Sequence, residues 1–318
     1  MITSETNTTL EAYNKETSET HELIVVSSSG ERNLYFLRNC ETVGFPEQLD
    51  FRWVKKGKTK ASLTLAISKD LEAISLPQSP FGGVWIEDNL SSSALQAFLA
   101  ALLEDLRQRK VTLVRIVQPP KPYELNGDLI NYLLFKLGFG QESVLSHQFF
   151  IGKKKIKKLV QQESAKYFSK TKDLGLKILA GPIQNFGFLH DIKSWNQDRE
   201  YDILFDHSRL ISQVSEFPER YFLISLLKDG KTIAHTLGVK LLPDSIYYFL
   251  SATLPKSTIK NLGELCLFQL FQLASDQKLN FIDFGSSDSD SGANHNLMFF
   301  KSRFSNDISN KVSWILNL

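Results

Sequence analysis

Residues 262–285 read LGELCLFQLFQLASDQKLNFIDFG, and this stretch decides the fold. Its first part is rich in leucine and phenylalanine, which predicts a helix over residues 262–277. The segment NFIDF at residues 280–284 predicts a strand directly after it. Strands are also predicted before the helix, at residues 221–227, 232–241 and 245–251. Hairpins followed by a strand-helix-strand unit predict an α/β (α+β) fold with a mixed sheet flanked by helices.

The first half of the chain repeats the order of elements found in the second half. In each half a helix, a strand, a helix and a strand follow one another: residues 93–110, 111–117, 128–137 and 144–151, then 262–277, 280–284, 296–304 and 312–316. The string Phe-Lys-x-x-Phe begins at Phe135 in one copy and at Phe300 in the other. We therefore predict a diverged duplication, with domains over residues 22–152 and 153–318.

The region before the first of these helices is predicted to form strands and a tail. Short strands are expected at residues 22–27 and 33–37, and a hairpin over residues 51–67 turns at Gly57. Residues 1–21 are rich in Ser, Thr and Glu and have no apolar core. We expect them to form a disordered tail rather than a signal peptide.

Length and composition exclude several classes of protein. A chain of 318 residues suits two domains. Two cysteines, Cys40 and Cys266, are too few for a disulfide framework or a four-cysteine metal site. There is no run of 18 apolar residues, so we expect no membrane span and a cytoplasmic location. A net charge of +2 does not favour nucleic-acid binding as the main function, and the sequence makes no prediction of the oligomeric state.

Four short motifs, in this order, resemble a known family. They are SPFGG at residues 79–83, KTIAH at 231–235, DFG at 283–285 and FFKSRF at 299–304. The second half is similar to a GNAT acyltransferase domain, and the tandem arrangement resembles the FemAB-like family, the Fem-type aminoacyltransferases that build peptidoglycan bridges. The resemblance implies two tandem GNAT-like domains with the working site in the second. It also implies acyl-CoA or aminoacyl-tRNA as the donor, although the long coiled-coil arm of some tRNA-dependent members is absent.

The start of the helix at residue 262 is the expected donor site. GNAT enzymes bind the donor pyrophosphate at a helix N-terminus, where unpaired N–H groups and the helix dipole favour an anion. Their motif is [Q/R]-x-x-G-x-[G/A], and Lys260, Asn261 and Gly263 occupy the matching place. Glu264 puts a negative charge there, and Leu265 replaces the small residue. The alternative interpretation is a plain helix start with Glu264 stabilising the dipole.

Lys301 and Asp283 are the predicted catalytic residues. The Fem-type resemblance places Lys301 near the transfer site, where its ammonium would stabilise a developing oxyanion, and Phe299 and Phe300 beside it would exclude water. The alternative is a solvated helix lysine. Asp283 is predicted to orient the acceptor amine or to act as a base, or alternatively to cap a turn.

The other predicted substrate contacts are spread along the second half: Phe300, Arg303, His235, Tyr248 and Lys154. His235 lies in a predicted strand and is alternatively a core histidine. Lys154 belongs to a lysine run at residues 153–158 that would meet phosphates of a precursor or of tRNA, or would simply be a solvated helix face. A second lysine cluster, at residues 55–60, allows the same two interpretations. The six histidines show no metal-ligand spacing, so no metal is predicted.

Two functions are compatible with these residues. The first is an acyl- or aminoacyl-transferase that acts on an amine of a small molecule, a cell-envelope precursor or a sugar-nucleotide precursor. The second is a non-catalytic tandem GNAT-like binding module, because the pyrophosphate motif is degenerate. Acyl transfer from an activated donor needs orientation and an oxyanion site rather than a nucleophilic triad, so the lack of a triad motif does not exclude an enzyme.

Overall fold

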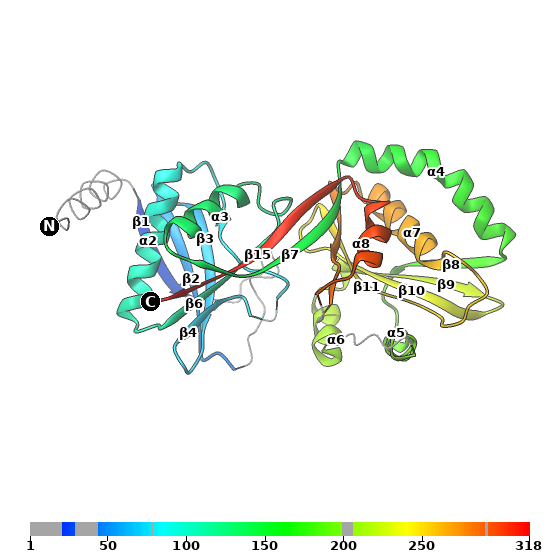
Figure 1. Ribbon diagram of the computed structural model, residues 1–318, viewed down its shortest axis with the longest axis horizontal. Helices are drawn as coiled ribbons and strands as arrows, with labels where there is room; N and C mark the ends of the chain where they lie inside the picture. Colours follow the sequence, from blue (N-terminus) through cyan, green and yellow to red (C-terminus); the bar gives the residue numbers. More distant parts are fainter. Residues whose placement is uncertain (1–20, 29–43, 78, 199–205, 290–291) are drawn as a thin grey trace. The chain divides into compact units, whose positions relative to one another are not determined.

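The computed structural model describes residues 21–28, 44–77, 79–198, 206–289 and 292–318. The chain divides into two compact units: unit 1 is Met1–Leu145 with Ser309–Leu318, and unit 2 is Ser146–Ile308. Each unit is an α/β structure with a mixed sheet, which confirms the predicted fold class (Figure 1). The strand predicted at residues 33–37 and the tail up to residue 20 lie outside the described residues.

The sheet of unit 1 begins with three antiparallel strands and continues with a parallel pair. Its order is β1-β2-β3-β4-β6-β15, and the short β5 pairs with β3. Strands β4 and β6 run parallel, whereas β15 runs antiparallel to β6. The strands are β1 (Glu22–Ser27), β2 (Glu47–Lys55), β3 (Lys58–Ile67), β4 (Glu72–Ser75), β5 (Trp85–Ile86), β6 (Leu113–Gln118) and β15 (Asp307–Asn317). The predicted hairpin is confirmed: Lys56 and Gly57 turn between β2 and β3 with positive φ angles, as a tight hairpin requires.

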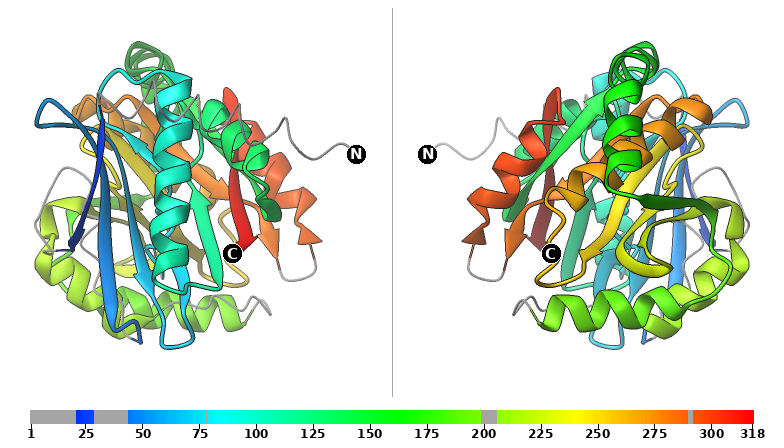
Figure 2. Two further views of the ribbon diagram at one scale, coloured as in Figure 1. Left: turned by 90° about the vertical axis from the view of Figure 1, so that its left-hand side faces the viewer. Right: turned by 90° about the vertical axis from the view of Figure 1, so that its right-hand side faces the viewer.

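In the described part of unit 1, the helices that cover the sheet are α2 (Ser92–Gln108) and α3 (Gly127–Lys136). The hydroxyl of Ser91 caps α2 by accepting a hydrogen bond from the N–H of Ala94 at 3.2 Å. The leucines of α2 recur at helical spacing and are buried against the strands, in one cluster with residues of α3 and β15. The left view in Figure 2 shows α2 lying along the sheet.

The sheet of unit 2 has the order β7-β12-β11-β10-β9-β8. Strands β8 to β11 form an antiparallel meander, β12 runs parallel to β11, and β7 runs antiparallel to β12. The strands are β7 (Gly140–Ile151), β8 (Leu176–Pro182), β9 (Tyr221–Lys228), β10 (Lys231–Val239), β11 (Ser245–Thr253) and β12 (Phe281–Ser286). Strands β13 (Asp288–Ser289) and β14 (Gly292–Ala293) form a separate small hairpin.

Helices cover both faces of the sheet of unit 2. Helices α4 (Lys153–Asp173), α7 (Leu262–Asp276) and α8 (His295–Ser302) lie on one face, and α5 (Gly187–Gln197) and α6 (His207–Glu216) lie on the other (Figures 1 and 2). A short 3-10 helix, Pro218–Arg220, leads into β9. Apolar residues of α4 and α7 form one buried cluster with β9, β11 and β12. No helix in the described part of the chain is long and apolar enough to cross a membrane.

The two units have corresponding topologies, but their last strands are exchanged. In unit 1, α2 joins the parallel strands β4 and β6, and α3 follows; in unit 2, α7 joins β11 and β12, and α8 follows. The strand after α3 is β7, whose end completes the sheet of unit 2. The strand after α8 is β15, and its Val312 and Trp314 are buried in the core of unit 1. The last ten residues, assigned from the sequence to the second domain, therefore pack in unit 1.

Candidate functional site

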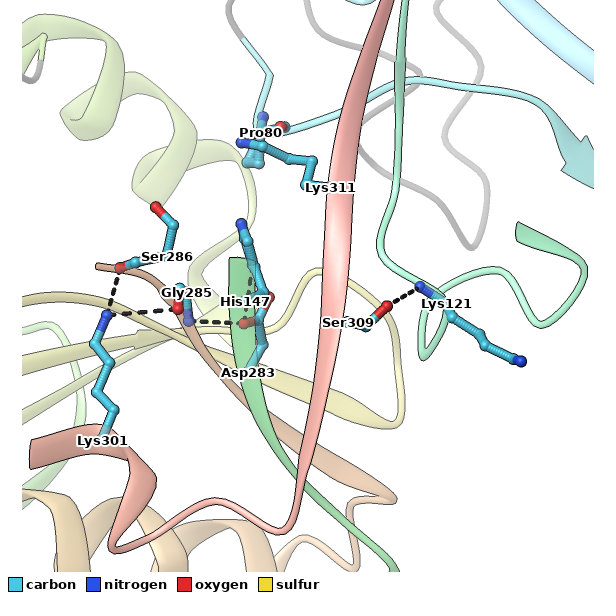
Figure 3. A network of polar contacts seen from close by, with 9 residues as sticks. All are labelled: Pro80, Lys121, His147, Asp283, Gly285, Ser286, Lys301, Ser309 and Lys311. Carbon is cyan, nitrogen blue, oxygen red and sulfur yellow. Dashed lines mark hydrogen bonds and ion pairs between the residues drawn. The ribbon is translucent and has the colours of Figure 1, made fainter. Parts of the chain in front are cut away.

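Lys301 is buried near the end of α8, with 4% of its surface exposed. Its ammonium donates hydrogen bonds to the carbonyl oxygens of Ser286 at 2.5 Å and Gly285 at 3.5 Å, at the end of β12 (Figure 3). Asn294 caps α8 by accepting from the N–H of Leu297 at 3.0 Å, which fixes where the helix starts. The alternative interpretation of Lys301 as a solvated helix lysine is therefore wrong.

Burial changes the protonation equilibrium of this lysine. Removal from water lowers the pKa of Lys301 to about 8, although the charges of Asp283 and Asp288 act to raise it. Near neutral pH the side chain is still mainly an ammonium, and two of its three N–H bonds are directed at the carbonyl oxygens of Gly285 and Ser286. It is thus a cation in a dry environment, where its field is stronger than in water.

Asp283 lies on β12 and is completely buried. Its Oδ1 accepts a hydrogen bond from the N–H of Gly285 at 2.7 Å, two residues further along the same strand. Both of its carboxylate oxygens also lie 3.2 Å from Nδ1 of His147 (Figure 3). Asp283 therefore connects the backbone at Gly285, the imidazole and the environment of Lys301.

His147 is a candidate site residue that the sequence analysis missed. It lies on β7 and is 3% exposed. It faces Asp283 because β7 pairs with β12 in a register that sets His147 opposite Ser286. If Nδ1 carries the proton toward the carboxylate, Nε2 becomes a proton acceptor. Only the pairing register of two strands far apart in the sequence brings these residues together, so no local pattern reveals the pair.

The parallel strands β11 and β12 separate directly beside this site. They pair over three positions, the last of which sets Tyr247 opposite Asp283, and then diverge. Burial, and to a lesser degree the charge of Asp283, raises the pKa of Tyr247. The ring of Tyr247 lies 3.1 Å from where a side chain on Gly285 would begin, and Gly285 has a φ of +71°. A glycine is needed at this position for both reasons.

The predicted donor residues lie at the start of α7. Lys260 is exposed, and Asn261 stands before the helix with a left-handed φ of 64° and makes no side-chain cap. Gly263 faces the ring of Phe300, 3.6 Å from where its side chain would begin. Leu265, which departs from the GNAT motif, is 1% exposed and belongs to a core cluster. A large apolar residue at that position therefore serves packing.

Arg303 neutralises the acidic residue at the same helix start. Its guanidinium lies 2.8 Å from the carboxylate of Glu264 and 5.5 Å from the ring centres of Phe300 and Phe304. The expectation that Phe299 shields Lys301 from water is wrong, because Phe299 is 70% exposed. Phe300 is half-buried and packs toward α7.

His235 lies in a different set of contacts. It is 4% exposed, its Nδ1 is 2.9 Å from the hydroxyl of Ser225, and its Nε2 is 3.2 Å from Asp191 on α5. The indole of Trp195 stacks on its ring. Burial lowers the pKa of His235, although the hydrogen bond to Asp191 opposes this. These contacts fit the alternative interpretation of a core histidine that attaches α5 to the sheet.

Tyr248 and Lys154 are not joined to Lys301 by any contact in the described residues. Tyr248 lies on β11, and burial raises its pKa to about 12, although the neighbouring hydroxyls of Ser251 and Thr236 act to lower it. Lys154 is exposed in the first turn of α4 among the other lysines of that run. Within the described ranges, no group of three or more His, Cys, Asp or Glu side chains is arranged to bind a metal.

Comparisons with known proteins reveal fold similarity only. No family model and no curated protein matches the sequence. Among solved structures, FemX has a TM-score of 0.61 at 12% identity and covers 85% of this chain and 87% of its own. A tandem GNAT protein from the clavulanic acid biosynthesis pathway has a TM-score of 0.53 at 11% identity, and the match covers 93% of this chain and 98% of that protein. L-PGS from Bacillus licheniformis has a TM-score of 0.51 at 13% identity, and the match covers 96% of this chain and 90% of that protein. The resemblance to FemAB-like and tandem GNAT proteins is thus confirmed at the level of fold.

Proposed function

We propose that this protein is an N-acyltransferase and that unit 2 carries the reaction at Lys301, Asp283 and His147. The observation that supports this most directly is the buried ammonium of Lys301 beside a buried carboxylate. Burying a charge is unfavourable, and perturbed, desolvated ionisable groups concentrate at functional sites. The fold shared with FemX and a tandem GNAT protein is consistent with group transfer.

The proposed reaction follows from these three side chains. A neutral amine attacks the carbonyl carbon of an activated acyl group, and the carbonyl electrons move onto oxygen. The ammonium of Lys301 stabilises that oxyanion through its remaining N–H bond. His147 takes the proton released by the amine, and Asp283 stabilises the imidazolium that forms. The intermediate collapses to the amide and expels the leaving group, which recovers the proton.

For the donor, we propose acyl-CoA rather than aminoacyl-tRNA. The solved structure of the tandem GNAT protein from the clavulanic acid pathway is characterised as one without AcCoA, so acetyl-CoA is the molecule considered for that protein. In the present chain, α7 starts after β11, where β11 and β12 stop pairing. The N-terminus of a helix favours phosphate binding, so the start of α7 suits the pyrophosphate of a CoA donor. The acceptor that we propose is an amine on a cell-envelope or sugar-nucleotide precursor, as the Fem-type resemblance implies.

The test is a transfer assay with the purified chain. Acetyl-CoA and longer acyl-CoA donors are incubated with a panel of amines, and release of the free CoA thiol is followed together with amide formation by mass spectrometry. Lys301→Met is compared with Lys136→Met, which changes the exposed lysine of the other Phe-Lys string. Transfer by the wild-type chain that Lys301→Met alone removes supports the proposal. No transfer with any acyl-CoA, but transfer from aminoacyl-tRNA, would reject the proposed donor and keep the reaction.

One observation favours a second candidate, a non-catalytic binding module. The ion pair between Glu264 and Arg303 occupies the start of α7, where a donor pyrophosphate would need positive charge. If this candidate is right, the protein binds CoA or an amine without releasing product, and Lys301→Met changes affinity rather than rate. Equilibrium binding measured beside the transfer assay separates the two functions.

A further inference from the structure

Unit 1 contains a lysine-lined cavity that the proposed reaction does not use. Its volume is about 470 Å³, and it is lined by Lys55, Lys56, Lys58 and Lys60 together with the residues that lead into α2. This volume is within the range of small-molecule sites in proteins. The lysines are close together because β2 and β3 form a tight hairpin in which Lys55 pairs directly with Lys58.

The charges around this cavity are strongly unbalanced. Asp88 is an acidic partner of this cluster: its carboxylate lies 2.5 Å from the ammonium of Lys60. Its pKa is lowered, first by the hydrogen bond to Lys60, and the charge of Lys58 contributes to this. Among the described residues, neither Lys55 nor Lys56 has an ion-pair partner. Like charges held on one hairpin repel one another, so an anion in the cavity would relieve that repulsion.

The position of the cavity in the fold also favours a ligand. Strands β4 and β6 are parallel, and α2 connects them, so α2 begins beyond the carboxyl end of β4. The register of β3 with β4 and β5 places the hairpin of Lys58 at that same end. In open α/β sheets, ligands bind outside the carboxyl ends of the parallel strands. The cavity therefore lies where the architecture favours binding.

An aromatic wall completes the site. His21 lines the cavity and stacks on the buried Trp53, with ring centres 5.6 Å apart and planes 4° apart. We propose that this cavity binds a small molecule that carries a diphosphate or triphosphate, with the lysines contacting the phosphates. Lysine ammonium groups act as strong point-charge donors to phosphate oxygens. This inference does not rest on the proposed acyl transfer, because it concerns other residues in the other unit.

The experiment is calorimetric titration of the full chain with inorganic pyrophosphate and with ATP, in a buffer without phosphate. The test variant is Lys55→Gln/Lys58→Gln. The control variant, Lys69→Gln/Lys136→Gln, removes two exposed charges elsewhere in unit 1. We expect one site per chain, an affinity that falls about tenfold or more in the test variant and less than about twofold in the control, and weaker binding at higher salt. Circular dichroism confirms that both variants fold.

Three results would overturn the proposal. Absence of binding at millimolar pyrophosphate and ATP would show that the cavity has no such ligand. An equal loss in the test and control variants would show a general effect of net charge. Binding to vesicles that contain phosphatidylglycerol, without binding to either soluble probe, would show that the lysines form a surface for anionic lipids instead of a small-molecule site.

Discussion

Replacing Lys301 by Met tests both the chemistry and the energetics of the candidate site. The pKa of this lysine falls from 10.5 to about 8 on folding, which corresponds to about 3 kcal/mol of unfavourable burial at neutral pH. The hydrogen bonds to Gly285 and Ser286 each stabilise the folded state by about 1 kcal/mol. The variant should therefore melt within a few degrees of the wild type at pH 7, while transfer slows by a factor on the order of 100 to 1000.

The pH dependence of stability gives the sharper test. Because the folded-state pKa of Lys301 is lowered, the unfolded chain binds more protons between about pH 8 and pH 10.5. Wild-type stability therefore gains a contribution that rises with pH across this window, by up to about 3 kcal/mol, and Lys301→Met lacks it. Urea unfolding at pH 7, 8, 9 and 10 measures the difference. A difference that stays constant with pH, or a variant with full transfer activity, refutes the reasoning.

Three further changes test other parts of the structure. Asp283→Asn removes a charge that favours the ammonium of Lys301; the pKa of that lysine should fall below about 8, and the pH–rate profile should shift toward acid while the rate drops. A rate profile unchanged in position would contradict this. Glu264→Gln removes the negative charge at the start of α7 and should tighten CoA binding a few-fold in calorimetry; weaker binding would count against a donor site there. Gly83→Ala should destabilise unit 1 by roughly 2 kcal/mol or more in thermal unfolding, because φ is +69° and the new methyl would meet a proline 2.5 Å away. The control Gly181→Ala, which has open space around it, should change stability little.

The secondary structure could be predicted well because the signals are local. The leucine and phenylalanine spacing of α7, the Lys56-Gly57 turn and the alternating strands of the meander are each set within a few residues. The mixed sheet followed from the order of these elements. Lys301 could be singled out from the FFKSRF segment and its Fem-type resemblance, but its burial could not be predicted, because burial depends on where α8 lies against the end of β12.

The parts that could not be predicted depend on contacts between distant segments. The exchange of the last strands is invisible in the sequence, since the residues of β15 have the same pattern whichever sheet it joins. Its partner β6 precedes it in the chain by more than the whole length of unit 2. His147 escaped for the same reason, because only the register of β7 with β12 sets it against Asp283. Lys260 and Gly263 fit a phosphate motif loosely in the sequence. The neighbouring ion pair of Glu264 and Arg303 could not be predicted, because only the fold brings these two residues together.

The two Phe-Lys strings show how one sequence pattern acquires two different physical properties. Phe135 and Lys136 end α3, where Phe135 is 63% exposed and the ammonium of Lys136 lies 5.5 Å above the ring of Tyr132. At the corresponding position of α8, the ammonium of Lys301 is buried and bound to two carbonyl oxygens. A solvated ammonium is screened and cannot exert a strong field on a reacting carbonyl, whereas a desolvated one can. The difference in burial, rather than the shared string, is therefore the reason to place the reaction in unit 2.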